Sequence, residues 1–178
     1  MSDNRRIYRT IRIAIRQLFP IEPTGNKARM LNTMAAMIAG IVQAKSCQLP
    51  AIARKTPDQA KADSRIKRYS RWVQNERIDY ESYYLPFVGE LLTKLAESRE
   101  LVFVIDGSEV GHHCITLMIS LIFGKRTLPI IWLVVRGCKG HLPEDLHLDL
   151  LSKLQTILPA GCQAIFLGDG DFDVVKLQ

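Results

Sequence analysis

Leu101-Val-Phe-Val-Ile105, followed by Asp106, and Ala164-Ile-Phe-Leu-Gly168, followed by Asp169, are the two stretches that decide the fold. Each run has the length and the β-branched and aromatic content of a strand buried on both faces. Each aspartate is therefore expected at the carboxyl end of a strand, where carboxylates are well placed to hold a divalent metal ion. Alternatively, each aspartate only begins a turn, because Asp and Gly favour turns and both have a glycine close behind them. The recurrence of the pattern favours the metal interpretation.

The residues between these two runs predict how the strands pair. Two more strands and a helix are expected, at residues 114–123, 128–135 and 144–158. The first three strands fit an antiparallel meander, after which the helix crosses over and brings the last strand, 163–167, beside the first. This arrangement would place Asp106 and Asp169 side by side. The expected fold class is α/β (α+β), with a mixed sheet.

The first part of the chain has a helical pattern. Apolar residues recur at helical spacing, and turn-forming residues separate the segments, which cover residues 5–18, 27–45, 49–54, 63–75 and 79–98. Asp63 or Ser64 is expected to cap the fourth helix, and Pro86 is expected to interrupt or kink the last one. The chain is therefore expected to divide into a helical region, 1–98, and a sheet-containing domain, 99–178.

Composition excludes several classes of protein. With 178 residues, of which 47% are apolar and 24% charged, the chain can bury a core of ordinary size. No apolar run approaches the roughly 20 residues that span a bilayer, so a cytoplasmic protein without a membrane partner is expected. The four cysteines contain no Cys-x-x-Cys pair, and the histidines lack a tight ligand spacing. Neither a zinc site nor a disulfide scaffold is therefore expected.

The net charge of +6 is unevenly distributed. Residues 1–100 contain 18 Lys and Arg against 10 Asp and Glu, whereas residues 101–178 contain 6 against 8. A basic region beside a mildly acidic one suggests polyanion binding by the first and metal chemistry by the second. The alternative is that the basic residues only form solvated helix faces.

The helix expected at residues 63–75 is the best candidate for a DNA-binding element. Apolar and aromatic residues form a packing stripe along it, which leaves the cations for phosphate or base-edge contacts. These cations, the predicted DNA-binding residues, are Arg65, Lys67, Arg68 and Arg71. A cluster of short helices with a basic final member is compatible with a helix-turn-helix arrangement. Periodicity alone does not identify a recognition helix, because many basic amphipathic helices bind nothing.

Several short motifs together resemble the DDE transposases of bacterial insertion sequences. The matching pieces are Val104-Ile-Asp-Gly-Ser108, the Gly124-Lys-Arg-Thr-Leu-Pro129 turn leading to Lys139-Gly140, Leu167-Gly-Asp-Gly-Asp-Phe172, and Ser64-Arg-Ile-Lys-Arg-Tyr-Ser-Arg-Trp72. The resemblance covers nearly the whole chain, and it depends on the order and spacing of these pieces. The resemblance implies an N-terminal helical DNA-binding module followed by a truncated, ribonuclease H-like mixed sheet.

The resemblance also implies a catalytic role for the two aspartates. Asp106 matches the first catalytic aspartate of the family, and Asp169 matches the second. In the family these acids bind two divalent ions, Mg²⁺ or Mn²⁺, which contact the attacking and leaving oxygens during DNA strand cleavage and joining. The partner implied is DNA, at the terminal inverted repeats of a transposon. Asp171 is the weaker candidate beside Asp169, with a role in supporting the ligands.

The chain departs from the family pattern in one respect. The third acid of the family, a glutamate within a tyrosine-arginine-glutamate signature, has no counterpart in the nine residues after Asp169. The chain is therefore expected to be a transposase fragment that is inactive alone, with a homodimer or a missing C-terminal portion as its partner. One alternative is a catalytically dead DNA-binding remnant or an inhibitor of the full-length transposase. Another is an unrelated metal-dependent nuclease or phosphatase.

Overall fold

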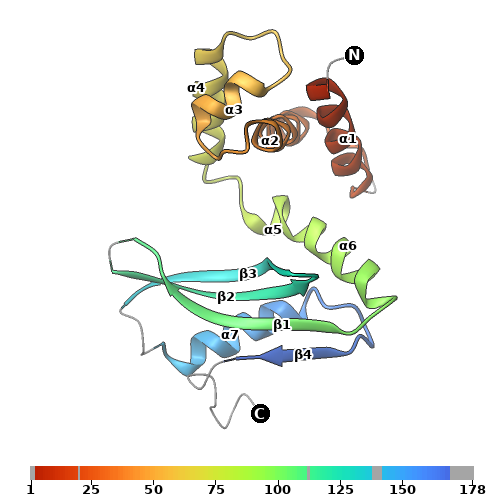
Figure 1. Cartoon of the computed structure of the whole chain (residues 1–178), viewed down its shortest axis with the longest axis vertical. Helices are drawn as coiled ribbons and strands as arrows, with labels where there is room; N and C mark the ends of the chain where they lie inside the picture. Colours follow the sequence, from red (N-terminus) through yellow and green to blue (C-terminus); the bar gives the residue numbers. More distant parts are fainter. Residues whose placement is uncertain (1–2, 20, 112, 138–141, 169–178) are drawn as a thin grey trace. The chain divides into compact units, whose positions relative to one another are not determined.

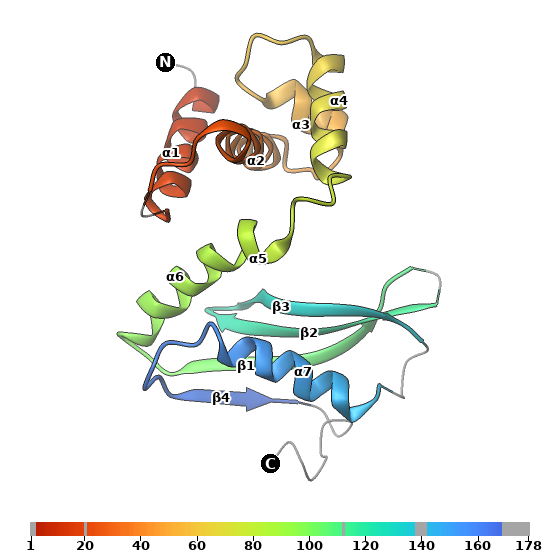
Figure 2. The ribbon, with the colours of Figure 1, turned by 180° about the vertical axis from the view of Figure 1, so that it is seen from behind.

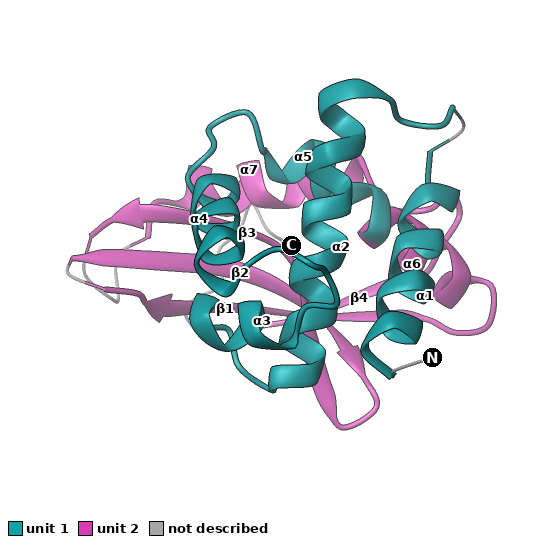
Figure 3. Cartoon of the chain, turned by 90° about the horizontal axis from the view of Figure 1, so that it is seen from above, with its two compact units in different colours: residues 1–87 teal, residues 88–178 magenta. Residues whose placement is uncertain are grey.

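The computed structural model describes residues 3–19, 21–111, 113–137 and 142–168. The chain forms two compact units, unit 1 at residues 1–87 and unit 2 at residues 88–178, which Figure 3 colours separately. The boundary lies inside a helix, α6 (Leu85–Ala96). The division expected from the sequence, after residue 98, lies just beyond the end of the same helix.

Unit 1 is helical (Figure 1). Its complete helices are α1 (Asp3–Gln17), α2 (Gly25–Ala44), α3 (Leu49–Lys55), α4 (Ala62–Val73) and α5 (Tyr80–Tyr83). The helical segments expected from the sequence are confirmed, and the last one is interrupted at Tyr84, between α5 and α6. Pro86 lies in the first turn of α6, where a residue without an N–H group is tolerated. Proline therefore starts a new helix here and does not kink a continuous one.

The core of unit 1 is built around α2. One cluster of buried residues combines Ala36 and Met37 of α2 with Ile52 of α3 and Tyr69 of α4. A second cluster combines the preceding turns of α2 with Ile15 of α1. The methionines and alanines of α2 therefore fill the core, which agrees with the adaptable packing of methionine.

Gly40 allows α2 and α3 to approach closely. A Cβ atom at Gly40 would lie 2.6 Å from Ile52 Cγ2 and 2.8 Å from the Ile52 carbonyl oxygen. Both distances are shorter than real Cβ contacts. The absence of a side chain at this position is therefore a packing requirement of unit 1.

The N-terminal cap expected for α4 is wrong. The helix begins at Ala62 with Lys61 as its N-cap, and no side chain caps it. The backbone N–H of Arg65 already bonds to the Lys61 carbonyl at 3.1 Å, so the first helical turn closes before Ser64 could act as a cap. Asp63 instead lies in the first turn, where its negative charge interacts favourably with the positive end of the helix dipole.

Unit 2 contains a four-stranded mixed sheet in the order β3-β2-β1-β4 (Figure 1). Its elements after α6 are β1 (Leu101–Glu109), β2 (Cys114–Phe123), β3 (Arg126–Arg136), α7 (Glu144–Gln155) and β4 (Ala164–Leu167). β1, β2 and β3 pair antiparallel, and β4 pairs parallel to β1 with Leu101 opposite Ala164 and Val104 opposite Leu167. The expected meander and helical crossover are therefore confirmed. Gly124, with a φ of 63°, starts the two-residue turn between β2 and β3.

Among the described residues, one face of β1 is buried and the other is half-buried or exposed, so the expectation of strands buried on both faces is wrong. α7 lies across one face (Figure 2), and burial alternates along β1, with Leu101, Phe103 and Ile105 buried and their neighbours half-buried. β4 is more exposed than β1. Its Phe166 retains 41% of its accessible surface, even though the ring stacks on Phe103. Continuous apolar runs do not distinguish one covered face from two.

The described residues form a mixed α/β protein with seven helices and a four-stranded sheet. Among these seven helices, none combines the length and the apolar character needed to cross a membrane.

Candidate nucleic-acid interface

α4 is held in unit 1 by two hydrogen bonds from its inner face. Tyr69 is fully buried, and its hydroxyl donates to Thr56 Oγ1 at 2.7 Å. Trp72 is partly buried, and its indole Nε1 donates to the Met30 carbonyl oxygen at 3.0 Å. Buried Tyr and Trp side chains usually satisfy their polar atoms in this way. These contacts with α2 and the loop after α3 fix which side of α4 stays exposed.

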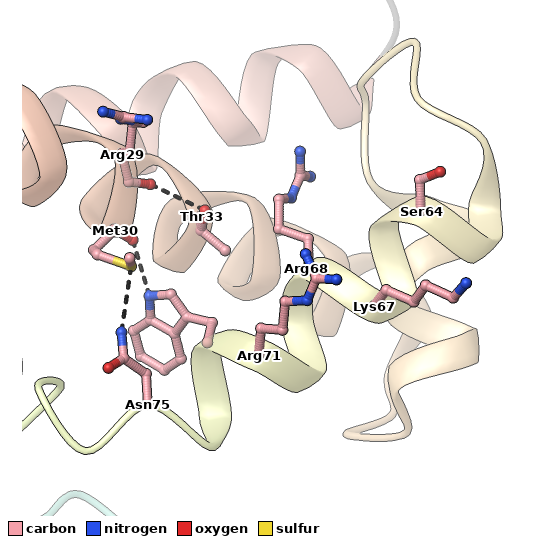
Figure 4. Close-up of a pocket in the computed structure, with 9 residues that line it drawn as sticks. Arg29, Met30, Thr33, Ser64, Lys67, Arg68, Arg71 and Asn75 are labelled. Atoms are coloured by element: carbon pink, nitrogen blue, oxygen red, sulfur yellow. Dashed lines mark hydrogen bonds between the residues drawn. The ribbon is translucent and has the colours of Figure 1, made fainter.

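A groove of about 630 Å³ lies beside α4 and α2 in unit 1 (Figure 4). Its cationic side chains come from both helices: Arg29 from α2, and Lys67, Arg68 and Arg71 from α4. Its remaining lining residues are uncharged: Met30, Thr33, Ser64, Trp72 and Asn75. None of the described residues that line this groove is acidic. Four cations around one hollow create a positive potential that attracts polyanions.

Asp58 lies beside the groove and binds Arg68. Nη2 of Arg68 donates to Oδ2 of Asp58 and, at 3.3 Å, to the hydroxyl oxygen of Tyr69. Partial burial raises the pKa of Asp58, but the hydrogen bonds from Arg68 and the Ala60 backbone outweigh this effect and lower the pKa below its ordinary value. Asp58 is therefore ionised at neutral pH and holds Arg68 in a defined position at the edge of the groove.

Arg65 has a different environment from the other predicted DNA-binding residues. Its Nη1 atom donates to the Asp58 carbonyl oxygen at 3.0 Å and to Asp58 Oδ1 at 3.2 Å. Only 13% of its side chain is exposed, and it does not line the groove. Arg65 thus joins the start of α4 to the loop after α3, which orders the backbone beside the groove.

The structure brings together three of the four predicted residues, Lys67, Arg68 and Arg71, and separates Arg65 from them. The groove also contains Arg29, which is not among the predicted DNA-binding residues. The sequence pattern that could have identified it is the recurrence of polar residues at spacings of three and four along α2, at Asn26, Arg29 and Thr33.

Asp106 lies on β1 of unit 2, but not at the end of the strand as expected. β1 continues to Glu109, and Asp106 is paired with Met118 of β2. Its carboxylate is exposed, and Oδ2 accepts a hydrogen bond from Ser108 Oγ at 3.0 Å. The turn-forming Gly107 and Ser108 are therefore part of the antiparallel ladder, because their partners Leu117 and Thr116 continue it.

The second predicted acid, Asp169, and its neighbours Asp171 and Asp173 lie outside the described residues. The described pairing of β4 with β1 ends at Leu167 and Val104, and these residues precede Asp169 and Asp106 by two positions in the sequence. Among the described residues, no group of three His, Cys, Asp or Glu side chains could hold a metal ion. Asp106 offers a suitable oxygen ligand, yet the described residues alone do not fit a two-metal site.

Comparison with known proteins identifies no relative, since no family model, no curated protein and no solved structure matches the chain.

Proposed function

We propose that the chain binds DNA through the cationic groove of unit 1, as the DNA-binding part of a DDE transposase. The observation that carries the proposal is the groove itself, in which Arg29, Lys67, Arg68 and Arg71 surround one hollow without a lining acid among the described residues. Two helices supply these cations, so their common location depends on tertiary packing. A solvated helix face would not require this convergence.

The chemistry of the lining residues fits a nucleic-acid backbone. Lys and Arg side chains neutralise phosphates, and Ser, Thr and Asn side chains commonly donate further hydrogen bonds to phosphate oxygens. Ser64 and Asn75 supply such groups at the walls of the groove, whereas the Thr33 hydroxyl already donates to the Arg29 carbonyl oxygen at 3.0 Å. We leave Arg65 out of the proposed DNA contacts, because only 13% of its side chain is exposed and it does not line the groove, whereas Arg68 keeps 41% of its side chain exposed although it too binds Asp58.

Two observations in unit 2 support the transposase part of the proposal. The sheet order β3-β2-β1-β4, with β4 parallel to β1, is compatible with the ribonuclease H-like core that the sequence resembles. Asp106 lies on the central part of this sheet with an exposed carboxylate. In this proposal Asp106 and Asp169 are metal ligands, and Mg²⁺ or Mn²⁺ would supply the charge stabilisation for phosphoryl transfer.

Binding is tested by fluorescence anisotropy with labelled duplex DNA at several salt concentrations. The double substitution Lys67→Gln and Arg71→Gln removes two groove cations. We expect it to lower affinity roughly tenfold and to reduce the slope of log affinity against log salt by about 2. The matched control is Lys94→Gln with Lys153→Gln, which removes two exposed cations from unit 2. Equal losses in both variants would contradict the proposal.

Catalysis is tested separately, with inverted-repeat duplexes in the presence of Mg²⁺ or Mn²⁺. Cleavage by the wild-type chain that Asp106→Asn abolishes would assign strand-cleavage chemistry to unit 2 and would contradict the expectation that this chain is inactive alone. Binding with a preference for inverted repeats, but without cleavage, would instead favour the alternative function, a non-catalytic protein that occupies transposon ends. Metal-dependent hydrolysis without preference for any DNA sequence would favour an unrelated nuclease.

A further inference from the structure

Two smaller hollows adjoin the groove in unit 1. One, of about 390 Å³, shares Met30 and Asn75 with the groove and adds Lys27 and Arg77 to the cationic lining. The other, of about 360 Å³, shares Arg29, Thr33 and Arg68 with it. Neighbouring hollows share wall residues, and together their lining residues follow α2 from Asn26 to Ala36.

The cations of the first hollow are available to a ligand. Lys27 and Arg77 are both exposed, and neither forms a salt bridge within the described part of the chain. The Lys27 ammonium lies 4.6 Å from the centre of the Phe19 ring. The pKa of Asp79 is lowered mainly by hydrogen bonds from Ser82, and the charge of Lys27 adds to this effect. Asn75 Oδ1 accepts the backbone N–H of Arg77 at 3.1 Å, which fixes the turn that carries Arg77 beside the shared wall.

The hollow at the opposite end is lined by Asp58, and among the described residues no other acid lines any of the three hollows. The charge of Asp58 is compensated by Arg65 and Arg68, so it does not cancel the positive potential of the groove. The net cationic surface thus runs from Arg68 past Arg29 to Lys27 and Arg77.

We infer that the three hollows form one channel for an extended nucleic-acid backbone, with Lys27 and Arg77 as a second phosphate-binding subsite. The channel follows α2 from Asn26 to Ala36, which is about 15 Å at the helical rise of 1.5 Å per residue. This length corresponds to about four nucleotides of one strand in duplex DNA, at 3.4 Å per nucleotide. A single phosphate or a mononucleotide would fill only one of the hollows. The inference rests on the proposed function and specifies the length and register of the ligand.

The test compares three double variants of the full chain in the same salt-dependent anisotropy assay. These are Lys27→Gln with Arg77→Gln at the new subsite, Lys67→Gln with Arg71→Gln in the groove, and Lys94→Gln with Lys153→Gln as the control. We expect the first two to lose roughly tenfold in affinity and about 2 in salt slope, and the control to keep both.

The outcomes separate the inference from the proposed function. If the groove variant weakens binding but the Lys27 and Arg77 variant does not, the channel ends at Met30 and Asn75 and the inference is wrong, while the function stands. If neither weakens binding, the proposed function fails. Should the subsite variant melt at a lower temperature, the charge-retaining pair Lys27→Arg with Arg77→Lys decides: restored affinity supports the inference, and unrestored affinity overturns it.

A competition experiment tests the length of the ligand independently. An unlabelled oligonucleotide of about eight nucleotides should displace the labelled DNA far better than inorganic phosphate at the same phosphate concentration. Equal competition by inorganic phosphate would identify separate single-phosphate sites and would overturn the channel.

Discussion

Each of the two units is stabilised internally by a different kind of interaction, and this difference decides whether a substitution changes ligand binding, stability or both. Unit 1 carries 16 Lys and Arg against 7 Asp and Glu, whereas unit 2 carries 8 against 11. In unit 1, side-chain hydrogen bonds such as Tyr69 to Thr56 and Trp72 to Met30 join short helices beside the groove. In unit 2, backbone ladders and one apolar face form the sheet, and Asp106 lies on the half-buried side.

In unit 1, the same residues contribute to the proposed interface and to the packing. Arg68 lines the groove and also binds Asp58, so one side chain serves ligand and fold. Asp106 is different, because the sheet depends on its backbone and not on its exposed carboxylate. Substitutions near the groove should therefore change ligand binding and stability together. Substitutions on the sheet should change one of these properties without the other.

The largest expected effect is on the apolar face of unit 2. Phe103→Ala removes a fully buried ring that stacks on Phe166 at 5.4 Å, and should destabilise unit 2 by about 3–5 kcal/mol. Chemical denaturation monitored by circular dichroism measures the loss. Ile165→Ala is the control on the same pair of strands, because Ile165 keeps 41% of its accessible surface and should cost much less. Equal losses would show that the covered face does not dominate the stability of unit 2.

The next effect is a packing clash in unit 1. Gly40→Ala places a Cβ atom against Ile52 of α3, and we expect a loss of about 1–3 kcal/mol. The matched control, Gly89→Ala in α6, meets open space and should stabilise the chain by up to about 1 kcal/mol. A stability gain at both positions would contradict the close approach of α2 and α3.

Tyr69→Phe removes one hydroxyl from the polar network in unit 1. The variant loses the hydrogen bond that this hydroxyl donates to Thr56 Oγ1 and the one that it accepts from Arg68 Nη2, without changing the buried ring, and should cost about 1 kcal/mol in thermal unfolding. Thr56 still donates to the Ile52 carbonyl, so its hydroxyl remains satisfied. No change in stability would indicate that the Tyr69 hydroxyl does not contribute to the stability of unit 1.

The smallest expected effect is the pH dependence supplied by Asp58. Its pKa is lowered in the folded state, so its stabilisation is complete above the unfolded value of about 3.8 and is lost as pH falls through the lower folded value. Asp58→Asn should remove this part of the pH dependence, which lies below about pH 4. Thermal unfolding in parallel acid series measures it. Parallel curves for both proteins would show that the ion pair with Arg68 contributes nothing.

The sequence predicted most of the fold, because periodicity and turn residues are local signals. All helices of unit 1 and the order of the sheet follow from them. The end of β1 did not follow, since Asp106-Gly-Ser108 has the composition of a turn and remains a strand only because Leu117 and Thr116 of β2 continue the ladder. Helical spacing likewise could not show that Arg65 faces Asp58, which comes from a separate loop. Arg29 joined the groove only through the tertiary packing of α2 and α4.

The most direct test of the central claim uses the unmodified chain and compares lysine reactivity in the two units. An amine-acylating reagent is applied with and without duplex DNA, and peptide mass spectrometry quantifies labelling at Lys67, Lys94 and Lys153. We predict that DNA protects Lys67 of the groove and leaves Lys94 and Lys153 of unit 2 equally reactive. Protection of Lys94 and Lys153 without protection of Lys67 would contradict DNA binding by the groove of unit 1.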